Sequence, residues 1–305
     1  MGLIGGFDFL GTRYASNPFD IVLANDINER ATMTLGYNFD NLNIVCGDAI
    51  ELVKSDLPYA DVLVGGFPCQ DFSLAGKKQG LAVERGNLYK AMVCALKKVR
   101  PKIFIAENVK GLLLWQNGLA IKTIIEDFAE CGYEVTYKLL NMADFGIPQK
   151  RERIFIVGVR KDLQKEFKFP SPTHAEIPTE TLKKWVSIED AIKDLEDDAV
   201  ASQKFNNDYS KAKKNKGQGN SVTKANQPAP TMRAEHHGNI EFHYRLPRRL
   251  SAREAARIQS FPDNFKFLNS TTDAYRQIGN AVAPVFAWHL AQSILEILKS
   301  EGDLK

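Results

Sequence analysis

The sequence predicts an α/β fold with a mostly parallel sheet, because strand-like and helix-like segments alternate along its first half. The strand-like runs are β-branched and apolar without polar alternation, which is typical of strands covered on both faces. Amphipathic patterns between them predict helices that connect parallel strands. The strands are expected at residues 19–26, 43–48, 60–66, 102–108 and 153–159, and the clearest helices at 87–100 and 119–132.

A second, smaller and more irregular domain is expected after residue 160. Residues 168–180 are proline-rich, and only a short amphipathic helix follows at 185–198. Regular structure returns with Ser251 and Glu254, which have the spacing of a capping box at the start of a helix, and Pro262 closes that helix. Residues 284–300 predict a long amphipathic helix.

The composition is that of an ordinary soluble protein. The 305 residues are 44% hydrophobic and 25% charged, with a net charge of +3. No apolar run reaches the roughly 18 residues of a membrane helix and no leader pattern is visible, so a cytoplasmic protein without a membrane partner is expected. Four widely spaced cysteines suggest neither a disulfide framework nor a zinc site, and we expect no bound metal; they are Cys46, Cys69, Cys94 and Cys131.

Polar or small residues close four of the predicted strands, namely Asp26, Asp48, Gly66 and Glu107. In open α/β sheets ligands bind at the carboxyl ends of the strands, so these positions are candidates for a binding site. The alternative for each acidic residue is simple capping of the next helix.

Cys69 follows Pro68 just beyond the third strand, at the expected ligand edge. A lone cysteine is usually a small buried hydrophobe. At this edge its thiolate could instead attack an electron-poor carbon. Glu107 could donate a proton to a ring nitrogen in the same step, since burial would raise the pKa of its carboxyl group.

Arg151 and Arg153 occupy alternate positions at the beginning of the fifth strand, so both should point to one side. Two guanidiniums there could hold a carbonyl oxygen or a phosphate. Residues 204–224 are rich in lysine and contain a single acidic residue, Asp208. The lysines that precede the final Lys224 are Lys204, Lys211, Lys213, Lys214 and Lys216. This stretch is either a solvated loop or an arm that faces nucleic-acid phosphates, with Lys211, Lys213 and Lys214 as the contacts.

Six sequence blocks, taken together, resemble the DNA (cytosine-5) methyltransferases of bacterial restriction-modification systems. They are GGFPCQDFSLAGK, RGNLY, AENVKGL, NMADFGIPQKRERIFIVGVR, RRLSAREAARIQSFPDNF and YRQIGNAVAP, and they span nearly the whole chain. The resemblance implies a Rossmann-like sheet that binds S-adenosylmethionine, formed by residues 1–175 and 268–305. It also implies a target-recognition domain with a hinge at 176–267.

In such enzymes the cysteine, here Cys69, attacks carbon 6 of a cytosine flipped out of the duplex. The resemblance implies that Glu107 holds N3 and the amino group, and that Arg153, helped by Arg151, holds the base carbonyl. Carbon 5 then takes the methyl group of S-adenosylmethionine without a metal ion. Double-stranded DNA is the implied partner, the protein is expected to be a monomer, and a cognate restriction endonuclease is a candidate system partner.

The remaining site residues are also implied by the resemblance. The cofactor-binding positions are Gly5, Gly6, Phe7, Asp26, Ile27, Asp48, Ala49, Pro68, Leu88, Asn280 and Val282. Ser73 and Arg85 are expected to contact DNA phosphates or anchor a lid over the flipped base.

The first family block is incomplete, because Gly5, Gly6 and Phe7 match its end but its strand, acidic residue and first phenylalanine have no counterpart. Loss of a central strand would expose sheet edges and remove part of the cofactor floor. Two rival interpretations therefore stand beside DNA methylation. One is a tRNA cytosine-5 methyltransferase of the same fold, and the other is a catalytically impaired relative that only binds DNA.

Overall fold

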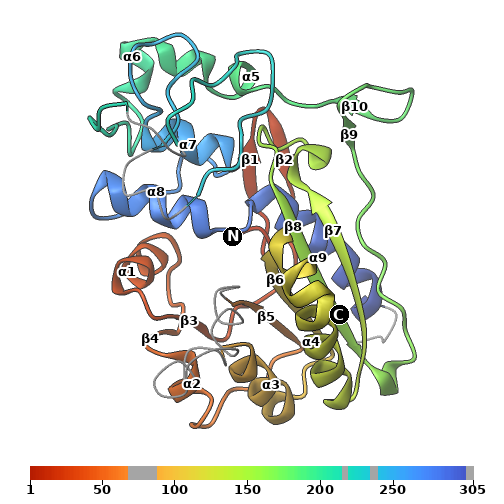
Figure 1. Ribbon diagram of the computed structural model, residues 1–305. Coiled ribbons are helices and arrows are strands. Elements are labelled where there is room, and N and C mark those ends of the chain that lie inside the picture. The colour runs from red at the N-terminus through yellow and green to blue at the C-terminus, as the bar shows by residue number, and fades with distance from the viewer. Residues whose placement is uncertain (68–87, 215–218, 234–239, 300–305) are drawn as a thin grey trace.

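The computed structural model describes residues 1–67, 88–214, 219–233 and 240–299 of the chain. Its larger sheet has the strand order β5(Val62–Gly66), β6(Ile103–Val109), β8(Glu152–Arg160), β7(Tyr133–Asn141) (Figure 1). Only β5 and β6 are parallel, because β8 runs antiparallel to both of its neighbours. The α/β class is confirmed, but the expectation of a mostly parallel sheet is wrong for this sheet. β7 was not predicted from the sequence, and its antiparallel pairing with β8 reverses the chain direction.

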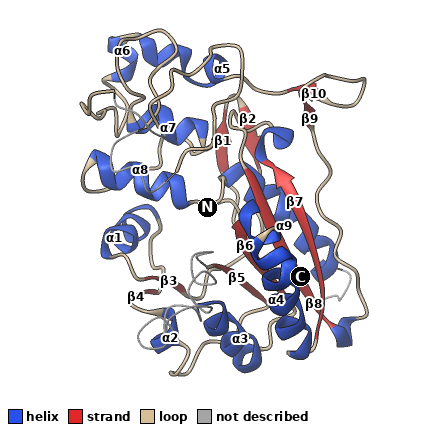
Figure 2. Cartoon of the chain, in the orientation of Figure 1, coloured by secondary structure: helices blue, strands red, loops and turns tan. Residues whose placement is uncertain are grey.

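Three further strand pairs lie outside this sheet. β3(Ala24–Asp26) and β4(Ile44–Cys46) form a separate parallel pair, although Figure 2 shows them in the same region as β5. Within the described residues, β5 has β6 as its only strand partner, and Val64 on β5 is 50% exposed. The exposed edge expected from the incomplete first block is therefore present. The other pairs are the antiparallel β1(Phe7–Phe9) and β2(Thr12–Tyr14), and the parallel β9(His174–Ala175) and β10(Lys183–Lys184).

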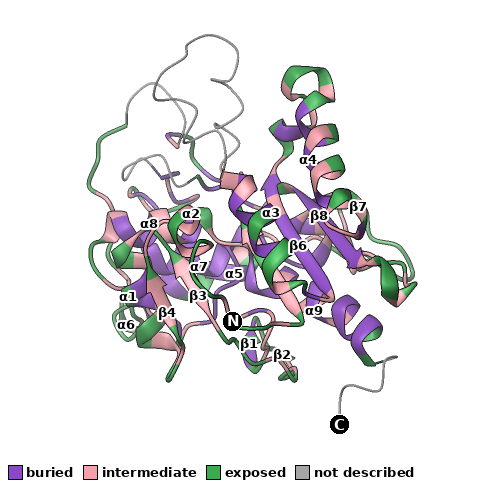
Figure 3. Cartoon of the chain, turned by 90° about the horizontal axis from the view of Figure 1, so that it is seen from below, coloured by how far each residue is buried: buried purple, intermediate pink, exposed green. Residues whose placement is uncertain are grey.

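Helices cover both faces of the larger sheet, since alternate residues of its central strands enter two different apolar clusters (Figure 3). Phe104 and Ile156 pack toward α3(Leu88–Val99) and α4(Leu119–Glu130). Ile105 and Phe155 pack on the other face, toward α9(Pro284–Lys299). Strands buried on both faces explain the continuous apolar runs in the sequence. The shorter helices α1(Glu29–Asn38) and α2(Ala49–Leu52) follow β3 and β4.

A second lobe has its own apolar cluster, built mainly from residues between Ile188 and Ile278. Its helices are α5(Ile188–Ile192), α6(Asp198–Ala201) and α7(Ala252–Ile258), and the next helix, α8(Thr271–Asn280), contributes residues to the same cluster. The capping box that the sequence predicted at Ser251 and Glu254 is present in full. Short 3₁₀ helices occupy Lys110–Leu113, Trp115–Gly118, Met142–Phe145, Lys161–Leu163 and Lys193–Glu196.

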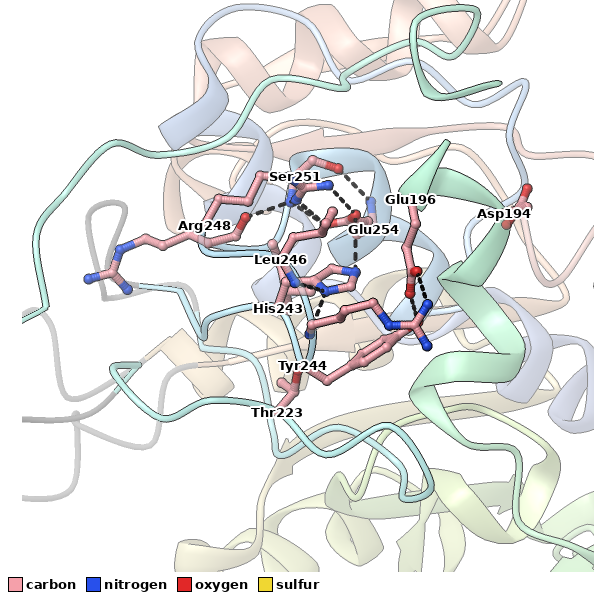
Figure 4. A network of polar contacts seen from close by, with 12 residues as sticks. Asp194, Glu196, Thr223, His243, Tyr244, Leu246, Arg248, Ser251 and Glu254 are labelled. Atoms are coloured by element: carbon pink, nitrogen blue, oxygen red, sulfur yellow. Dashed lines mark hydrogen bonds and ion pairs between the residues drawn. The ribbon is translucent and has the colours of Figure 1, made fainter. Parts of the chain in front are cut away.

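A buried polar network fixes the irregular part of this lobe (Figure 4). The Glu254 carboxylate is fully buried and accepts two 2.8 Å hydrogen bonds from the Arg248 guanidinium and one of 2.7 Å from the Ser251 amide. The imidazole of His243 lies 3.7 Å from the same carboxylate and accepts the amide of Leu246. These bonds replace the regular backbone ladder that the segment lacks.

One helical run in the described residues, Thr271–Lys299, is long and apolar enough to cross a membrane by length and composition. It is divided into α8 and α9 at Ala281, and 61% of its most apolar window is buried inside the protein. Both helices supply core residues to the clusters described above, so this run is a core element of the fold.

Gly158 is expected to tolerate no side chain, because it lies opposite Phe104 in the β6–β8 register. An added Cβ would lie 2.0 Å from the Phe104 ring. We expect Gly158→Ala to lower the free energy of unfolding by about 1 to 3 kcal/mol, measured by urea denaturation. Gly36→Ala is the control, since its Cβ would meet nothing closer than 3.6 Å within α1. That change should stabilise by about 0.5 to 1 kcal/mol. Equal effects of the two changes would contradict the packing assigned to Gly158.

Candidate active site

The centre of the site is an ion pair between Glu107 on β6 and Arg153 on β8, with 3.0 Å between Nε and Oε1. Arg153 lies opposite Val109, and Glu107 lies two residues before Val109 on the same strand face. Such diagonal positions are within reach of long side chains. Because β8 runs antiparallel to β6, its beginning lies at the edge where β6 ends. The side chain of Arg153 is only 13% exposed and that of Glu107 only 18%.

Burial sets the electrostatics of this pair. It raises the pKa of the Glu107 carboxyl group above its ordinary value, although the positive charges of Arg153 and Arg151 act in the opposite direction. Burial also lowers the pKa of the Arg153 guanidinium, an effect that Glu107 partly offsets. A carboxyl group in this position holds a proton to higher pH than a solvated one. It can therefore donate a hydrogen bond or a proton to a heteroaromatic nitrogen.

The end of β5 lies directly beside Glu107. In the parallel register Gly66 is the partner of Glu107, and a Cβ at Gly66 would lie 3.6 Å from the Glu107 Oε2 atom. The buried Asn108 amide donates a 2.7 Å hydrogen bond to the carbonyl of Phe67. The chain is thus fixed beside the carboxyl group two residues before Cys69. Four predicted site residues lie outside the described residues, namely Pro68, Cys69, Ser73 and Arg85.

Arg151 has a different environment from Arg153, although both lie near Glu107. It is 2% exposed, and its guanidinium donates to the carbonyls of Met232 at 3.0 Å and Gly279 at 2.7 Å. A third, longer contact of 3.3 Å reaches the carbonyl of Ala281. These contacts join the beginning of β8 to the second lobe and to the end of α8. Arg151 therefore orders backbone around the pair.

Three of the predicted cofactor residues line one cavity of about 310 Å³, namely Asp26, Asn280 and Val282. Asp26 ends β3, and its Oδ1 atom accepts the Asn28 amide. Beside it, Ile27 is 72% exposed. An exposed apolar side chain next to a carboxylate at a strand end suits a nucleoside. The flat base would pack on the apolar side chain, and the ribose hydroxyls would donate to the carboxylate.

Asn280 joins this cavity to the ion pair. It is the last residue of α8, and it also lines a second cavity of about 590 Å³ that contains Arg153. The cavity that contains Asp26 and the cavity that contains Arg153 therefore share Asn280 in their walls.

The other predicted cofactor residues are more scattered. Asp48 caps α2, which begins at Ala49, and Leu88 begins α3. Gly6 and Phe7 line a separate cavity of about 1000 Å³ on the second-lobe side, and Gly5 lies beside them with a positive φ of 65°. Phe7 is 4% exposed and stacks on Tyr14 with 5.1 Å between ring centroids. The structure does not bring Gly6 and Phe7 to the cavity that contains Asp26.

The predicted DNA-contact lysines that the structure describes are exposed. Lys211, Lys213 and Lys214 belong to a loop whose carbonyls at Ala212 and Lys213 accept hydrogen bonds from the buried Arg249 guanidinium. Among the described residues, no group of three or more His, Cys, Asp or Glu is placed to hold a metal ion. Cys46, Cys94 and Cys131 are free thiols.

The mixed sheet, its buried carboxylate–guanidinium pair and the adjoining cavities define an α/β protein with a candidate binding site at one sheet edge. The model of the C-5 cytosine-specific DNA methylase family matches residues 2–296. The chain belongs to this family, and it is therefore a DNA cytosine-5 methyltransferase. Family membership implies S-adenosylmethionine as the methyl donor.

Relatives of the chain are methyltransferases of the same kind. The chain is 39% identical to the type II methyltransferase M.NgoFVII of Neisseria gonorrhoeae, over 96% of this chain and 84% of that protein. It is 36% identical to M.FnuDI of Fusobacterium nucleatum, over 99% and 94%. A putative DNA modification methyltransferase from an Escherichia coli prophage has the same fold, with a TM-score of 0.68 at 22% identity and coverage of 92% and 94%. Spodoptera frugiperda DNMT2 aligns with a TM-score of 0.64 at 18% identity, covering 93% of each chain.

The Asn108 hydrogen bond to Phe67 can be tested by removing its donor. Asn108→Ala should cost about 1 to 3 kcal/mol of unfolding free energy, because the buried Phe67 carbonyl loses its partner. Methyl transfer should fall about 10- to 100-fold, because the chain that leads to Cys69 is no longer held beside Glu107. Asn108→Asp keeps the 2.8 Å hydrogen bond from the Val109 amide but loses the donor to Phe67. It should therefore lower the unfolding free energy and methyl transfer by similar amounts. Wild-type stability in both variants would contradict this role.

Replacement of Glu107 by Gln should change how stability depends on pH. Because the pKa of Glu107 is raised in the folded state, its contribution is fully present below about pH 4.5 and is lost as the pH rises through the folded value. The Glu107→Gln variant lacks this loss. Its unfolding free energy, measured by urea denaturation between about pH 5 and 8, should therefore rise relative to wild type as the pH increases. Parallel pH profiles would contradict the raised pKa.

Proposed function

We propose that the protein is a sequence-specific DNA (cytosine-5) methyltransferase that forms a covalent adduct between Cys69 and carbon 6 of a flipped-out cytosine. The observation that carries the proposal is the buried Glu107–Arg153 pair at the end of β5, three residues before Cys69. A flipped cytosine placed there would present N3 to Glu107 and its carbonyl oxygen to Arg153. Extrusion of the base costs a few kcal/mol, which contacts in the pocket would offset.

The proposed reaction uses the thiolate of Cys69, the carboxyl group of Glu107 and the guanidinium of Arg153. The Cys69 thiolate adds to carbon 6 while Glu107 supplies a proton or hydrogen bond at N3, so the electron pair of the ring double bond becomes available at carbon 5. S-adenosylmethionine, when bound, would supply an electrophilic methyl group for that carbon and would leave as S-adenosylhomocysteine. A water molecule or hydroxide would then take the proton from carbon 5, and the electron pair of that bond re-forms the ring double bond while the bond between carbon 6 and sulfur breaks. The thiolate leaves, and the proton at N3 returns to Glu107. The Arg153 guanidinium stabilises the negative charge that develops on the base.

We assign the methyl donor to the cavity lined by Asp26, Asn280 and Val282. Asp26 would accept hydrogen bonds from the ribose hydroxyls, and Ile27 would pack on the adenine ring. Asp48, Ala49 and Leu88 would complete this site. Asn280 supports the assignment because it lines both cavities. No metal ion is part of the proposal.

We also propose the division into a catalytic domain, 1–175 and 268–305, and a target-recognition domain with hinge, 176–267. Lys211, Lys213, Lys214, Ser73 and Arg85 are proposed DNA contacts. The relatives are type II methyltransferases, which supports a cytoplasmic protein that acts beside a cognate restriction endonuclease. A monomer would suffice for the chemistry described.

A second candidate function is DNA binding without methyl transfer. It is favoured by the separation of the β3–β4 pair from β5 and by the burial of Phe7 away from Asp26. Both features would weaken binding of S-adenosylmethionine. Calorimetric titration with S-adenosylhomocysteine distinguishes the candidates, because only the active enzyme requires measurable affinity for this product.

The proposed function is tested by incubating the protein with labelled S-adenosylmethionine and either duplex DNA or tRNA. Label should enter DNA, and bisulfite sequencing should place it on one cytosine of a fixed sequence. Cys69→Ser should abolish transfer and leave DNA binding unchanged, because the hydroxyl is a far weaker nucleophile. Label in tRNA alone would overturn the substrate, and turnover by the Cys69→Ser variant would overturn the covalent step. DNA binding without any transfer by the wild-type protein would favour the second candidate.

A further inference from the structure

The described lining of the cavity beside the ion pair is mainly basic, and it contains one acidic residue, Glu152. Arg153 lies within it, and three more cationic side chains line its walls: Lys110, Lys150 and Arg233. Lys110 pairs with Glu152 at 2.8 Å and Lys150 with Glu176 at 3.3 Å, but both lysines are about half exposed. Exposed pairs of this kind contribute little and exchange readily for other anions. The cavity therefore suits a strong anion next to the ligand of Glu107.

Arg233 is the cation that the second lobe contributes to this cavity. It is an exposed residue directly after the buried Met232. Its positive charge is close enough to lower the pKa of Arg153. Two guanidiniums that repel one another at one cavity are stabilised together when an anion lies between them.

The residue before Arg233 is held by a buried glutamine, Gln149, which is itself hydrogen-bonded to Gln259. The Gln149 side chain is fully buried, and its Oε1 atom accepts the Met232 amide at 3.1 Å. Its Nε2 atom donates to Gln259 Oε1 at 2.5 Å, and Gln259 in turn donates to the Ala281 carbonyl at 2.6 Å. This chain of bonds joins the segment before β8 to the second lobe, and its last acceptor also receives Arg151.

Backbone bonds complete the attachment. The Lys150 amide donates to the Ala229 carbonyl at 2.8 Å, and the Ala229 amide donates to the Pro148 carbonyl at 2.9 Å. The Thr231 hydroxyl donates to the Lys150 carbonyl at 2.7 Å. Residues 229–232 are thus held on residues 148–151, and Arg233 is the next residue along the chain.

We propose that Arg233 binds a backbone phosphate of DNA at the mouth of this cavity, and that Gln149 and Gln259 are the positioning residues that hold it there. The phosphate belongs to the backbone next to the cytosine held by Glu107, so this inference rests on the proposed function. Arg233 from the second lobe would then bind the phosphate, and Arg153 on β8 would bind the carbonyl oxygen of the flipped base. In phosphate binding the glutamine pair would act through Arg233, because neither glutamine lines the cavity.

The phosphate contact is tested by the salt dependence of binding to a labelled, unmethylated duplex. This duplex contains the sequence in which bisulfite sequencing finds the methylated cytosine. Arg233→Gln should weaken binding about tenfold and reduce the slope of log K against log salt by about 1, between about 50 and 200 mM KCl. Arg233→Lys should retain the slope. The matched control is Lys97→Gln in the last turn of α3, at the opposite edge of the sheet, which removes the same charge and should change neither value.

The positioning role is tested by a double-mutant cycle with Gln149→Met, a replacement of similar shape that cannot form the hydrogen bonds. If the glutamines act through Arg233, Gln149→Met should also lower the salt slope, and Arg233→Gln should add little in the double variant. Circular dichroism establishes that each variant is folded. If Gln149→Met does not fold, Gln259→Met takes its place in the cycle.

Additive losses would overturn the positioning role, and an unchanged slope in Arg233→Gln would overturn the phosphate contact. Either result with a wild-type protein that binds and methylates the duplex counts against this inference alone. A wild-type protein that neither binds nor methylates DNA would instead overturn the proposed function together with the inference.

Discussion

The site depends on the antiparallel pairing of β6 with β8. This pairing places the beginning of β8 at the sheet edge where β6 ends, so Arg153 reaches Glu107 across the strands. In a parallel arrangement the same two residues would lie at opposite edges. The hairpin formed by β7 and β8 creates the reversal, and Gly158 opposite Phe104 keeps the two central strands in close contact. The ion pair is therefore a product of topology as much as of residue type.

Buried polar side chains connect the lobes around this edge. Burial of the Arg151 guanidinium costs desolvation free energy, and the loss of hydration lowers the pKa of this group. Its carbonyl acceptors at Met232 and Gly279 compensate only when both lobes are in place. The same logic applies to Glu254, whose buried charge is matched by Arg248 inside the second lobe. Such groups favour one relative placement of the parts, because a shift would leave charges buried without partners.

The two sides of the proposed site differ in how the strands that carry them are joined. Asp26, Asn280 and Val282 share a cavity, but the β3–β4 pair that carries Asp26 is not hydrogen-bonded to β5. Val64 on β5 is half exposed, which leaves apolar surface and backbone groups on that strand facing solvent. Phe7 is packed in the main core and not beside Asp26. The buried Glu107–Arg153 pair favours methyl transfer, whereas the separation of the β3–β4 pair from β5 favours DNA binding alone.

The sequence by itself determined the α/β class, the positions of β5, β6 and β8 and of the helices α3, α4, α7 and α9, the capping box at Ser251 and the family, because these depend on local periodicity and on short motifs. It also predicted that Glu107 and Arg153 share a site. Only the tertiary structure decided the strand directions, the inward turn of Arg151 to backbone carbonyls and the place of Phe7 in the core. Gln149, Gln259 and Arg233 could not be recognised from the sequence, although Gln149 lies two residues before Arg151. Glutamines and arginines are common on surfaces, and their roles here arise from contacts between residues more than 80 positions apart.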